Sequence, residues 1–200
     1  MLTPNQFVRR WHSEVLATSA DPDDEQLATI PSRNINDFPR LPEITRKFLA
    51  EAGLPRSCAP CLSFDDLACG LRHVWDVFSP GQWKPEEKQG LENYAMIGFD
   101  GSDNPICVDE RDGQIVAIEH ELLFNKNAVE RRLMFVNSSV AQLAECLLLV
   151  ATHPKDAGLE AIKKIDEAAA VDGTFWSYES MDLEDQRLDE RSKKPWWKFW

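Results

Sequence analysis

The first half of the chain holds four side chains of the types that bind zinc or exchange disulfides. Cys58 and Cys61 form a C-x-x-C pair, and Cys69 and His73 follow within the next twelve residues. Seven residues separate Cys61 from Cys69, and several of them are apolar. This pattern favours buried thiols in a core segment over a zinc site or a redox pair. We therefore expect no metal and no cofactor.

Carboxylates gather around two Asp-Gly pairs later in the chain, Asp100-Gly101 and Asp112-Gly113. A calcium loop would need a closing glutamate at a fixed spacing, and none stands there. Gly98 and Gly101 lack the spacing of a phosphate cradle, and a strand rather than a helix is expected after them. Two interpretations stay open, a solvated acidic face or an acidic rim that binds a basic protein. The candidate rim consists of Asp103, Asp109, Glu110, Asp112, Glu119 and Glu121.

The histidines and serines show no catalytic pattern. His12, His73, His120 and His153 are dispersed, without HExxH or paired helical spacing. Ser138 has no nucleophile elbow around it, and helix capping explains it. We therefore predict that the chain is not an enzyme, and a catalytic pair that only the fold brings together is the alternative.

Acidic residues outnumber basic ones in this chain. It has 34 Asp and Glu against 22 Lys and Arg, a formal net charge of −12. Direct binding to nucleic acid needs a basic face, so this balance argues against it and suits a basic protein partner. No secretory signal is recognisable, and the longest nearly apolar stretch, residues 146–151, is too short to cross a bilayer. The odd number of cysteines fits a reducing compartment, so we expect a cytoplasmic protein.

Helical spacing dominates the N-terminal part. Thr3 can cap a first helix, in which Pro4 fits the first turn. The apolar stripe of this helix consists of Phe7, Val8, Trp11, Val15 and Leu16. A second helix is expected to begin near Pro42 and to end at Gly53. Its buried stripe consists of Ile44, Phe48 and Leu49. Residues 61–64 and 74–78 are expected to form short strands or turns.

Three β-type runs follow, at residues 94–99, 105–109 and 114–120. Both gaps contain an Asp-Gly pair, and the second supplies the positive φ angles of a tight hairpin turn. The pattern therefore predicts an antiparallel meander. Strand alternation places Ile106 with Val108, and Val116 with Ile118, on a buried face.

The C-terminal half reads as one more strand followed by helices. Residues 134–136 form the strand, and residues 137–139 cap a helix. Another helix is expected at about residues 157–171, ended by Gly173. A last helix would pack its apolar residues onto the body, namely Phe175, Trp176, Tyr178, Met181 and Leu183. The predicted fold is α+β, a mostly antiparallel sheet with a central β-meander, flanked by N-terminal and C-terminal helices.

Three sequence blocks resemble the SUKH superfamily, bacterial immunity proteins related to the fungal SMI/KNR cell-wall regulators. They are FLAEAGLP at residues 48–55, YAMIGFDGSDNPICVDERDGQIVAIEHE at residues 94–121, and MFVNSSVAQLAECLLL at residues 134–149. Their order and spacing are similar to the subgroup linked to toxins that carry nucleic-acid deaminases. The resemblance implies an α+β fold and a non-enzymatic role, the binding and neutralisation of a cognate toxin. The alternative is an SMI/KNR-like scaffold or regulatory adaptor.

The end of the chain lies outside this resemblance. We expect a single SUKH-like domain at residues 1–190 and a basic-aromatic tail at residues 191–200. Trp196, Trp197 and Trp200 are three of the seven tryptophans, and lysines accompany them. Such a segment suits a membrane surface, a groove on a partner, or a groove on its own domain. An unused tail is the remaining interpretation.

Overall fold

The structure is a computed structural model that describes residues 1–20, 22–23, 25–31, 37–58, 62–123, 133–154 and 156–179, except the side chains of residues 65 and 66. The helical elements are α1 (Pro4–Arg10), the π-helix η1 (Trp11–Leu16), α2 (Glu43–Glu51), η3 (Asp65–Cys69), α3 (Val74–Val77), α4 (Pro85–Lys88), η4 (His120–Leu122), α5 (Val140–Thr152), α6 (Leu159–Ile165) and η6 (Glu167–Ala170). The strands are β1 (Leu27–Ala28), β2 (Leu54–Pro55), β3 (Ser57–Cys58), β4 (Leu62–Ser63), β5 (Arg72–His73), β6 (Tyr94–Phe99), β7 (Pro105–Asp109), β8 (Ile115–Ile118) and β9 (Leu133–Asn137).

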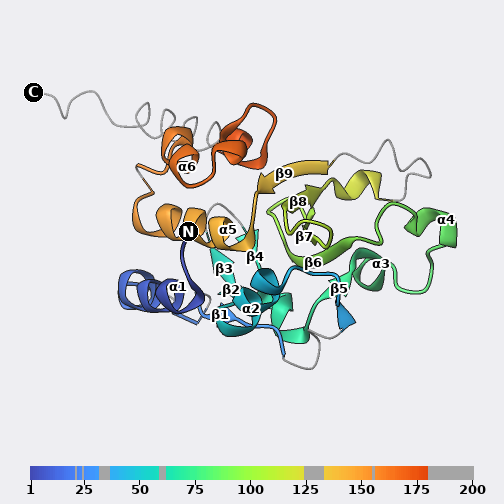
Figure 1. Ribbon diagram of the computed structural model, residues 1–200, viewed down its shortest axis with the longest axis horizontal. Coiled ribbons are helices and arrows are strands. Elements are labelled where there is room, and N and C mark those ends of the chain that lie inside the picture. The colour runs from blue at the N-terminus through green and yellow to red at the C-terminus, as the bar shows by residue number, and fades with distance from the viewer. Residues whose placement is uncertain are drawn as a thin grey trace, which may run out of the picture.

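Within the described residues, seven strands form one antiparallel sheet (Figure 1). Its order is β3-β4-β6-β7-β8-β9, and β5 also pairs with β6. Val108 in β7 lies opposite Ala95 in β6 on one side and opposite Ile115 in β8 on the other. The predicted meander and the α+β class are therefore confirmed. Strands β1 and β2 form a separate short pair.

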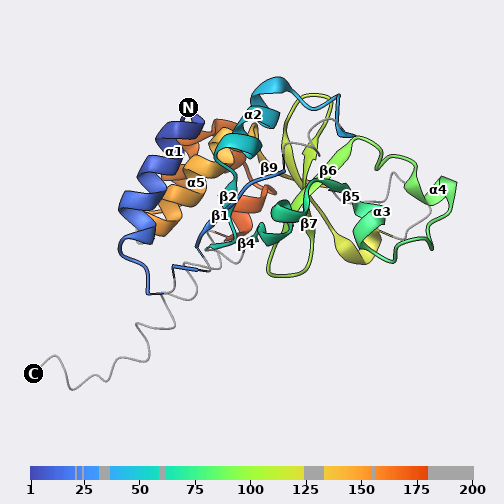
Figure 2. The same cartoon turned by 90° about the horizontal axis from the view of Figure 1, so that it is seen from below.

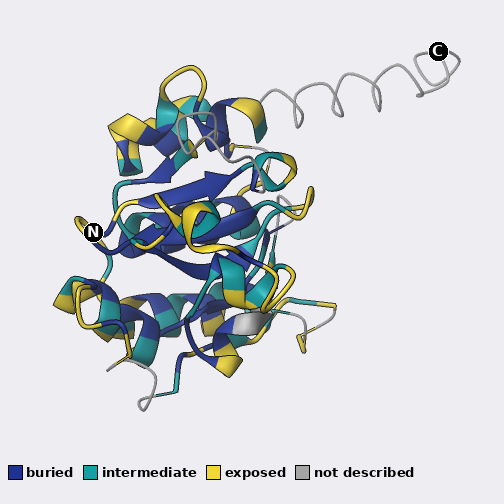
Figure 3. Ribbon diagram, turned by 90° about the vertical axis from the view of Figure 1, so that its right-hand side faces the viewer, coloured by how far each residue is buried: buried dark blue, intermediate teal, exposed yellow. Residues whose placement is uncertain are grey.

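The sheet is buried on both faces. Helices α1, α2 and α5 cover one face, and α3 lies on the other side of the sheet (Figure 2). Ile106 and Val108 belong to the core beneath α1, α2 and α5. Val116 and Ile118 belong to the second core. All four residues are buried as predicted, but the two pairs lie on opposite faces, and the central strands are buried throughout (Figure 3).

The N-terminal helix forms for the predicted reasons. The Thr3 hydroxyl accepts a hydrogen bond from the backbone N–H of Gln6, whose side chain accepts one from the N–H of Thr3. Phe7, Trp11 and Val15 are buried against α2 and α5. From Trp11 onward the helix widens into the π-helix η1, which the sequence pattern did not indicate.

Helix α2 buries a different stripe from the predicted one. Phe48 and Leu49 are buried as expected, and Gly53 ends the segment at a φ of +70°. Ile44, however, is 66% exposed, while Thr45 is buried. Thr45 is on the face that contacts the turn between β7 and β8, so the polar residue takes the inward position and the prediction for Ile44 is wrong.

Two other local expectations differ from the structure. Val74 and its successors form the short helix α3 rather than a strand or turn. The helix expected at residues 157–171 is interrupted at Asp166, whose extended backbone (φ −148°) separates α6 from η6. Residues 175–179 are helical, with Phe175 and Trp176 buried. Met181 and Leu183 lie outside the described residues.

Candidate protein-binding surface

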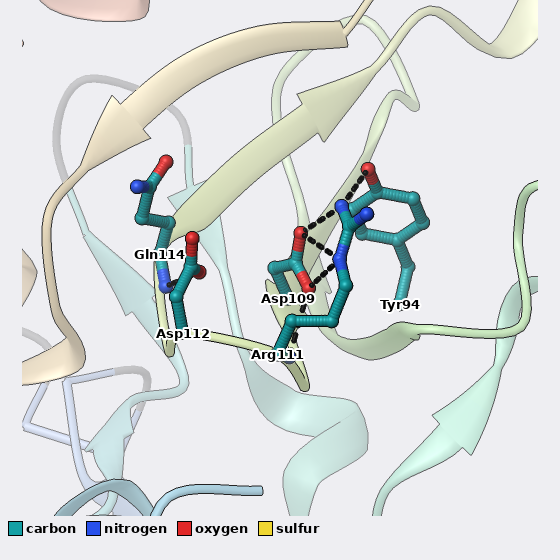
Figure 4. A network of polar contacts seen from close by, with 5 residues as sticks. All are labelled: Tyr94, Asp109, Arg111, Asp112 and Gln114. Carbon is teal, nitrogen blue, oxygen red and sulfur yellow. Dashed lines mark hydrogen bonds and ion pairs between the residues drawn. The ribbon is translucent and has the colours of Figure 1, made fainter. Parts of the chain in front are cut away.

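The hairpin between β7 and β8 carries a network of charged side chains (Figure 4). The guanidinium of Arg111 folds back over the turn, and its Nε donates to both carboxylate oxygens of Asp109 at 2.9 and 3.1 Å. Its Nη2 donates to the same carboxylate and, at 3.2 Å, to the hydroxyl of Tyr94. Burial acts to raise the pKa of Asp109, but the hydrogen bonds and charge of Arg111 outweigh it and hold that pKa below its ordinary value.

Glu110, the neighbour of Asp109, is also buried. It is 3% exposed, and its Oε2 accepts from Nε of Arg40 at 3.3 Å. Nη2 of Arg40 donates to the backbone carbonyl of Glu92 at 2.7 Å, so this arginine ties the hairpin to the segment before β6. Because Asp109 and Glu110 are buried and paired, they do not project from the surface. Of the six expected rim carboxylates, Asp109 and Glu110 are therefore buried. The other four are Asp103, Asp112 and Glu121, which are exposed, and Glu119, which is half-buried.

Two of the remaining carboxylates lie on tight turns. Asp112 accepts from the backbone N–H of Gln114 at 2.9 Å, and Gly113 has the predicted positive φ, +84°. In the turn between β6 and β7, Asp100 accepts hydrogen bonds from the backbone of Ser102 and from both the backbone and the side chain of Asn104. Here the positive φ (+60°) falls on Asp103 rather than on the glycine of the Asp-Gly pair. Both turns are therefore built by their aspartates.

A hollow of about 450 Å³ lies beside the second of these turns. Its wall combines the turn between β6 and β7, the residues that follow β8, one residue of β9 and the helical residues 175–179. Oδ1 of Asn104 accepts from the backbone N–H of His120 at 2.9 Å and lies 3.2 Å from the His120 ring nitrogen Nδ1. This contact fixes the turn against η4 and thereby sets the shape of the hollow.

The lining of the hollow is acidic and aromatic. Its carboxylates are Asp100, Glu119, Glu121 and Glu179, and its apolar side chains are Met134, Phe175 and Tyr178. Among the described residues, no lysine or arginine lines it. Asp100 is engaged in its turn, whereas the carboxylates of Glu119 and Glu121 take no hydrogen bond or ion pair within the described part of the chain. The hollow can therefore accept a cationic side chain with an apolar stem.

A buried polar cluster holds the helical wall of this hollow in place. The carboxylate of Asp166 accepts from the backbone N–H and the hydroxyl of Ser138, at 2.6 and 2.8 Å, and from the amide of Asn137 at 3.1 Å. Oδ1 of Asn137 in turn accepts from the indole Nε1 of Trp176. The N-cap of α5 is Ser139, so the expectation that capping explains Ser138 is wrong. Asp166 was not predicted, because the 28-residue separation between it and Ser138 leaves no local signal.

The described cysteines do not gather into a metal site. Cys58 is half-buried and donates weakly to the carbonyl of Leu62, but Cys69 is exposed, which corrects the expectation of a buried thiol there. His73 stacks on Trp75 at 4.3 Å. In the ranges given above, no three His, Cys, Asp or Glu side chains converge to hold a metal ion. Three predicted site residues and one cysteine lie outside the described residues, Trp196, Trp197, Trp200 and Cys61.

The described residues define an α+β protein with a central antiparallel meander and an acidic hollow beside it. The model of the SUKH-4 immunity protein family matches residues 16–185. The chain therefore belongs to the SUKH-4 immunity protein family, which confirms the resemblance to the SUKH superfamily and indicates a role in immunity against a toxin. Neither a curated protein nor a solved structure matches it. None of the described helices has the length and hydropathy needed to cross a membrane.

Proposed function

We propose that this protein neutralises a cognate protein toxin by binding it in the cytoplasm, with the acidic hollow as the centre of the interface. The observation that carries the proposal is a pair of carboxylates, Glu119 and Glu121, that take no partner among the described residues and line a hollow whose other wall includes Phe175 and Tyr178. A charge-assisted hydrogen bond to an arginine or lysine is stronger than a neutral one. An aromatic wall adds apolar contact area for the stem of the same side chain.

The remaining exposed rim carboxylates extend the acidic surface around this centre. Asp103 is exposed on the turn from which Asp100, Ser102 and Asn104 line the hollow, and Asp112 is exposed at the tip of the hairpin. Charges at the edge of an interface act mainly on the association rate, because they steer the approach of a partner of opposite charge. In this proposal Glu119 and Glu121 anchor the toxin, whereas Asp103 and Asp112 steer it.

The acidic surface favours a toxin that acts on nucleic acid, for example a deaminase. Such an enzyme needs a basic face to approach phosphates, and that face is complementary to the hollow and its rim. Binding there would keep the nucleic acid from the toxin without any chemistry by this chain. The net charge of −12 supports the same choice of partner.

The test is co-expression with the toxin candidate encoded next to this protein, scored by survival of the host cells. Wild-type protein should protect, and Glu119→Lys/Glu121→Lys should lose protection while remaining folded and soluble. Asp76→Lys/Glu86→Lys is the matched control, because both residues are exposed on α3 and α4, do not line the hollow, and change the net charge equally. Equal protection by wild type and the hollow variant would overturn the hollow as the binding site.

A further inference from the structure

The hollow adjoins the end of the described chain. Tyr178 and Glu179 line it, and residues 180–200 follow directly after them. Thirteen residues, 180–192, connect Glu179 to Lys193. Thirteen residues span at most about 45 Å, which limits how far residues 193–200 can lie from the hollow and lets them reach it.

The composition of that segment matches the hollow in both charge and apolar character. Residues 191–200 contain Arg191, Lys193, Lys194 and Lys198 and no acidic residue. Four of the last five residues are aromatic. The hollow presents the opposite charge through Glu119 and Glu121, and apolar contact area through Met134 and Tyr178. Within the described residues, its lining holds no lysine or arginine that would repel the segment.

We propose that residues 193–200 of this chain dock into its own acidic hollow. A short tether keeps the segment that it carries at an effective concentration of roughly 1 mM at a neighbouring site. An intrinsic dissociation constant of about 1 mM, typical of a short peptide, is then enough to keep the hollow occupied about half of the time. One lysine in contact with Glu119 and Glu121 and one tryptophan against Tyr178 meet that requirement.

Docking gives the segment a regulatory consequence, which rests on the proposed function. A toxin that binds the hollow must first displace residues 193–200. The apparent affinity for the toxin is therefore the intrinsic affinity multiplied by the fraction of time that the hollow is free. Deleting residues 193–200 should therefore strengthen toxin binding about twofold.

The experiment uses the full chain without any toxin, so that it can fail independently of the proposed function. The tryptophans are replaced biosynthetically by 5-fluorotryptophan, and the ¹⁹F resonances of Trp196, Trp197 and Trp200 are assigned by single Trp→Phe substitutions. A soluble gadolinium chelate then reports how accessible each indole is. We expect the chelate to relax at least one of the three about twofold less than in Glu119→Lys/Glu121→Lys, which is the full effect of shielding an indole for half of the time.

Two variants test the pairing. Asp76→Lys/Glu86→Lys should leave the shielding of the indoles from the chelate unchanged. Lys193→Glu/Lys194→Glu should restore this shielding when it is combined with Glu119→Lys/Glu121→Lys. Equal accessibility of all three indoles in wild type and in Glu119→Lys/Glu121→Lys would overturn the proposal. Shielding of the indoles from the chelate that is lost on dilution would also overturn it, because it indicates docking onto a second copy. Shielding that arises only with phosphatidylglycerol vesicles would indicate a membrane surface instead.

Discussion

The indole Nε1 of Trp176 donates a hydrogen bond of 3.0 Å to Oδ1 of Asn137, although the two residues are 39 positions apart. Both side chains are buried, and the same Asn137 amide donates to Asp166. The bond joins the helical residues 175–179 to the end of β9. Since Phe175 and Tyr178 line the hollow, this contact between two distant segments positions one of its walls.

Trp176→Phe tests that linkage. The phenyl ring keeps most of the apolar contact, but Oδ1 of Asn137 loses its donor and stays buried. An unsatisfied buried polar group costs about 1–3 kcal/mol, so the free energy of unfolding measured in urea should fall by that amount. A fall of less than about 0.5 kcal/mol would mean that the hydrogen bond does not contribute to the free energy of unfolding.

Gly113→Ala should destabilise the hairpin for two reasons. A residue other than glycine at φ +84° costs about 1–2 kcal/mol, and the new Cβ would lie 3.2 Å from Cγ of Pro42 and from Oγ1 of Thr45. Gly81→Ala is the matched control, because Gly81 has a φ of +78° with no atom within 4 Å. Urea unfolding should show a larger loss at Gly113, and equal losses would show that contact with α2 is unimportant.

Gly98→Ala isolates a steric effect without backbone strain. Gly98 does not have a positive φ, yet an added Cβ would lie 2.3 Å from the carbonyl oxygen of Ser63 and 2.6 Å from Cδ1 of Phe64. The pairing between β4 and β6 must open to accommodate it, so we expect a loss of roughly 3 kcal/mol or more. Gly158→Ala, where nothing lies within 4 Å, should change the melting temperature very little. A tolerated Gly98→Ala would contradict the close approach of these strands.

Arg111→Gln should make stability depend differently on pH. In the wild type the pKa of Asp109 is lowered, so its ionised form stabilises the fold above the ordinary aspartate pKa of about 3.9, and this contribution is lost as the pH falls through the folded value. Without Arg111, burial is left to raise that pKa. The urea midpoint of the variant should therefore be lower at pH 7 and approach the wild-type midpoint at about pH 3.

The exposed Arg9→Gln is the control for this pH series, because it removes the same charge from α1. It should shift the midpoint little at either pH. A deficit of Arg111→Gln that is the same at pH 7 and at pH 3 would mean that Asp109 ionisation does not contribute to stability.

Local signals in the sequence predicted where helices and strands form better than they predicted which residues contact one another. Asp-Gly pairs, strand alternation and the Ser139 cap predicted the meander and the start of α5, because each depends on residues within a few positions. The inward position of Thr45 and the break at Asp166 depend on contacts with the hairpin and with Ser138. Periodicity cannot show such contacts, so Ile44 and the second half of the C-terminal helix were assigned wrongly.

The candidate site divides in the same way. Acidic residues around the turns were recognisable as a group, and Glu119 and Glu121 do line the hollow. Whether a carboxylate faces solvent or an arginine was not recognisable, because Arg40 reaches Glu110 from 70 positions away. The aromatic wall comes from residues 175–179, whose place beside the turn at Asp100 only the fold determines.

The most direct test is to measure, by surface plasmon resonance at several salt concentrations, how the purified protein binds the purified cognate toxin. The wild type should bind with an association rate that falls as salt rises, because salt screens charges over roughly 10 Å at 0.1 M. Glu119→Lys/Glu121→Lys should weaken binding by at least about tenfold, and Asp76→Lys/Glu86→Lys by no more than about twofold. Binding to the hollow variant with wild-type affinity and wild-type salt dependence would contradict the account.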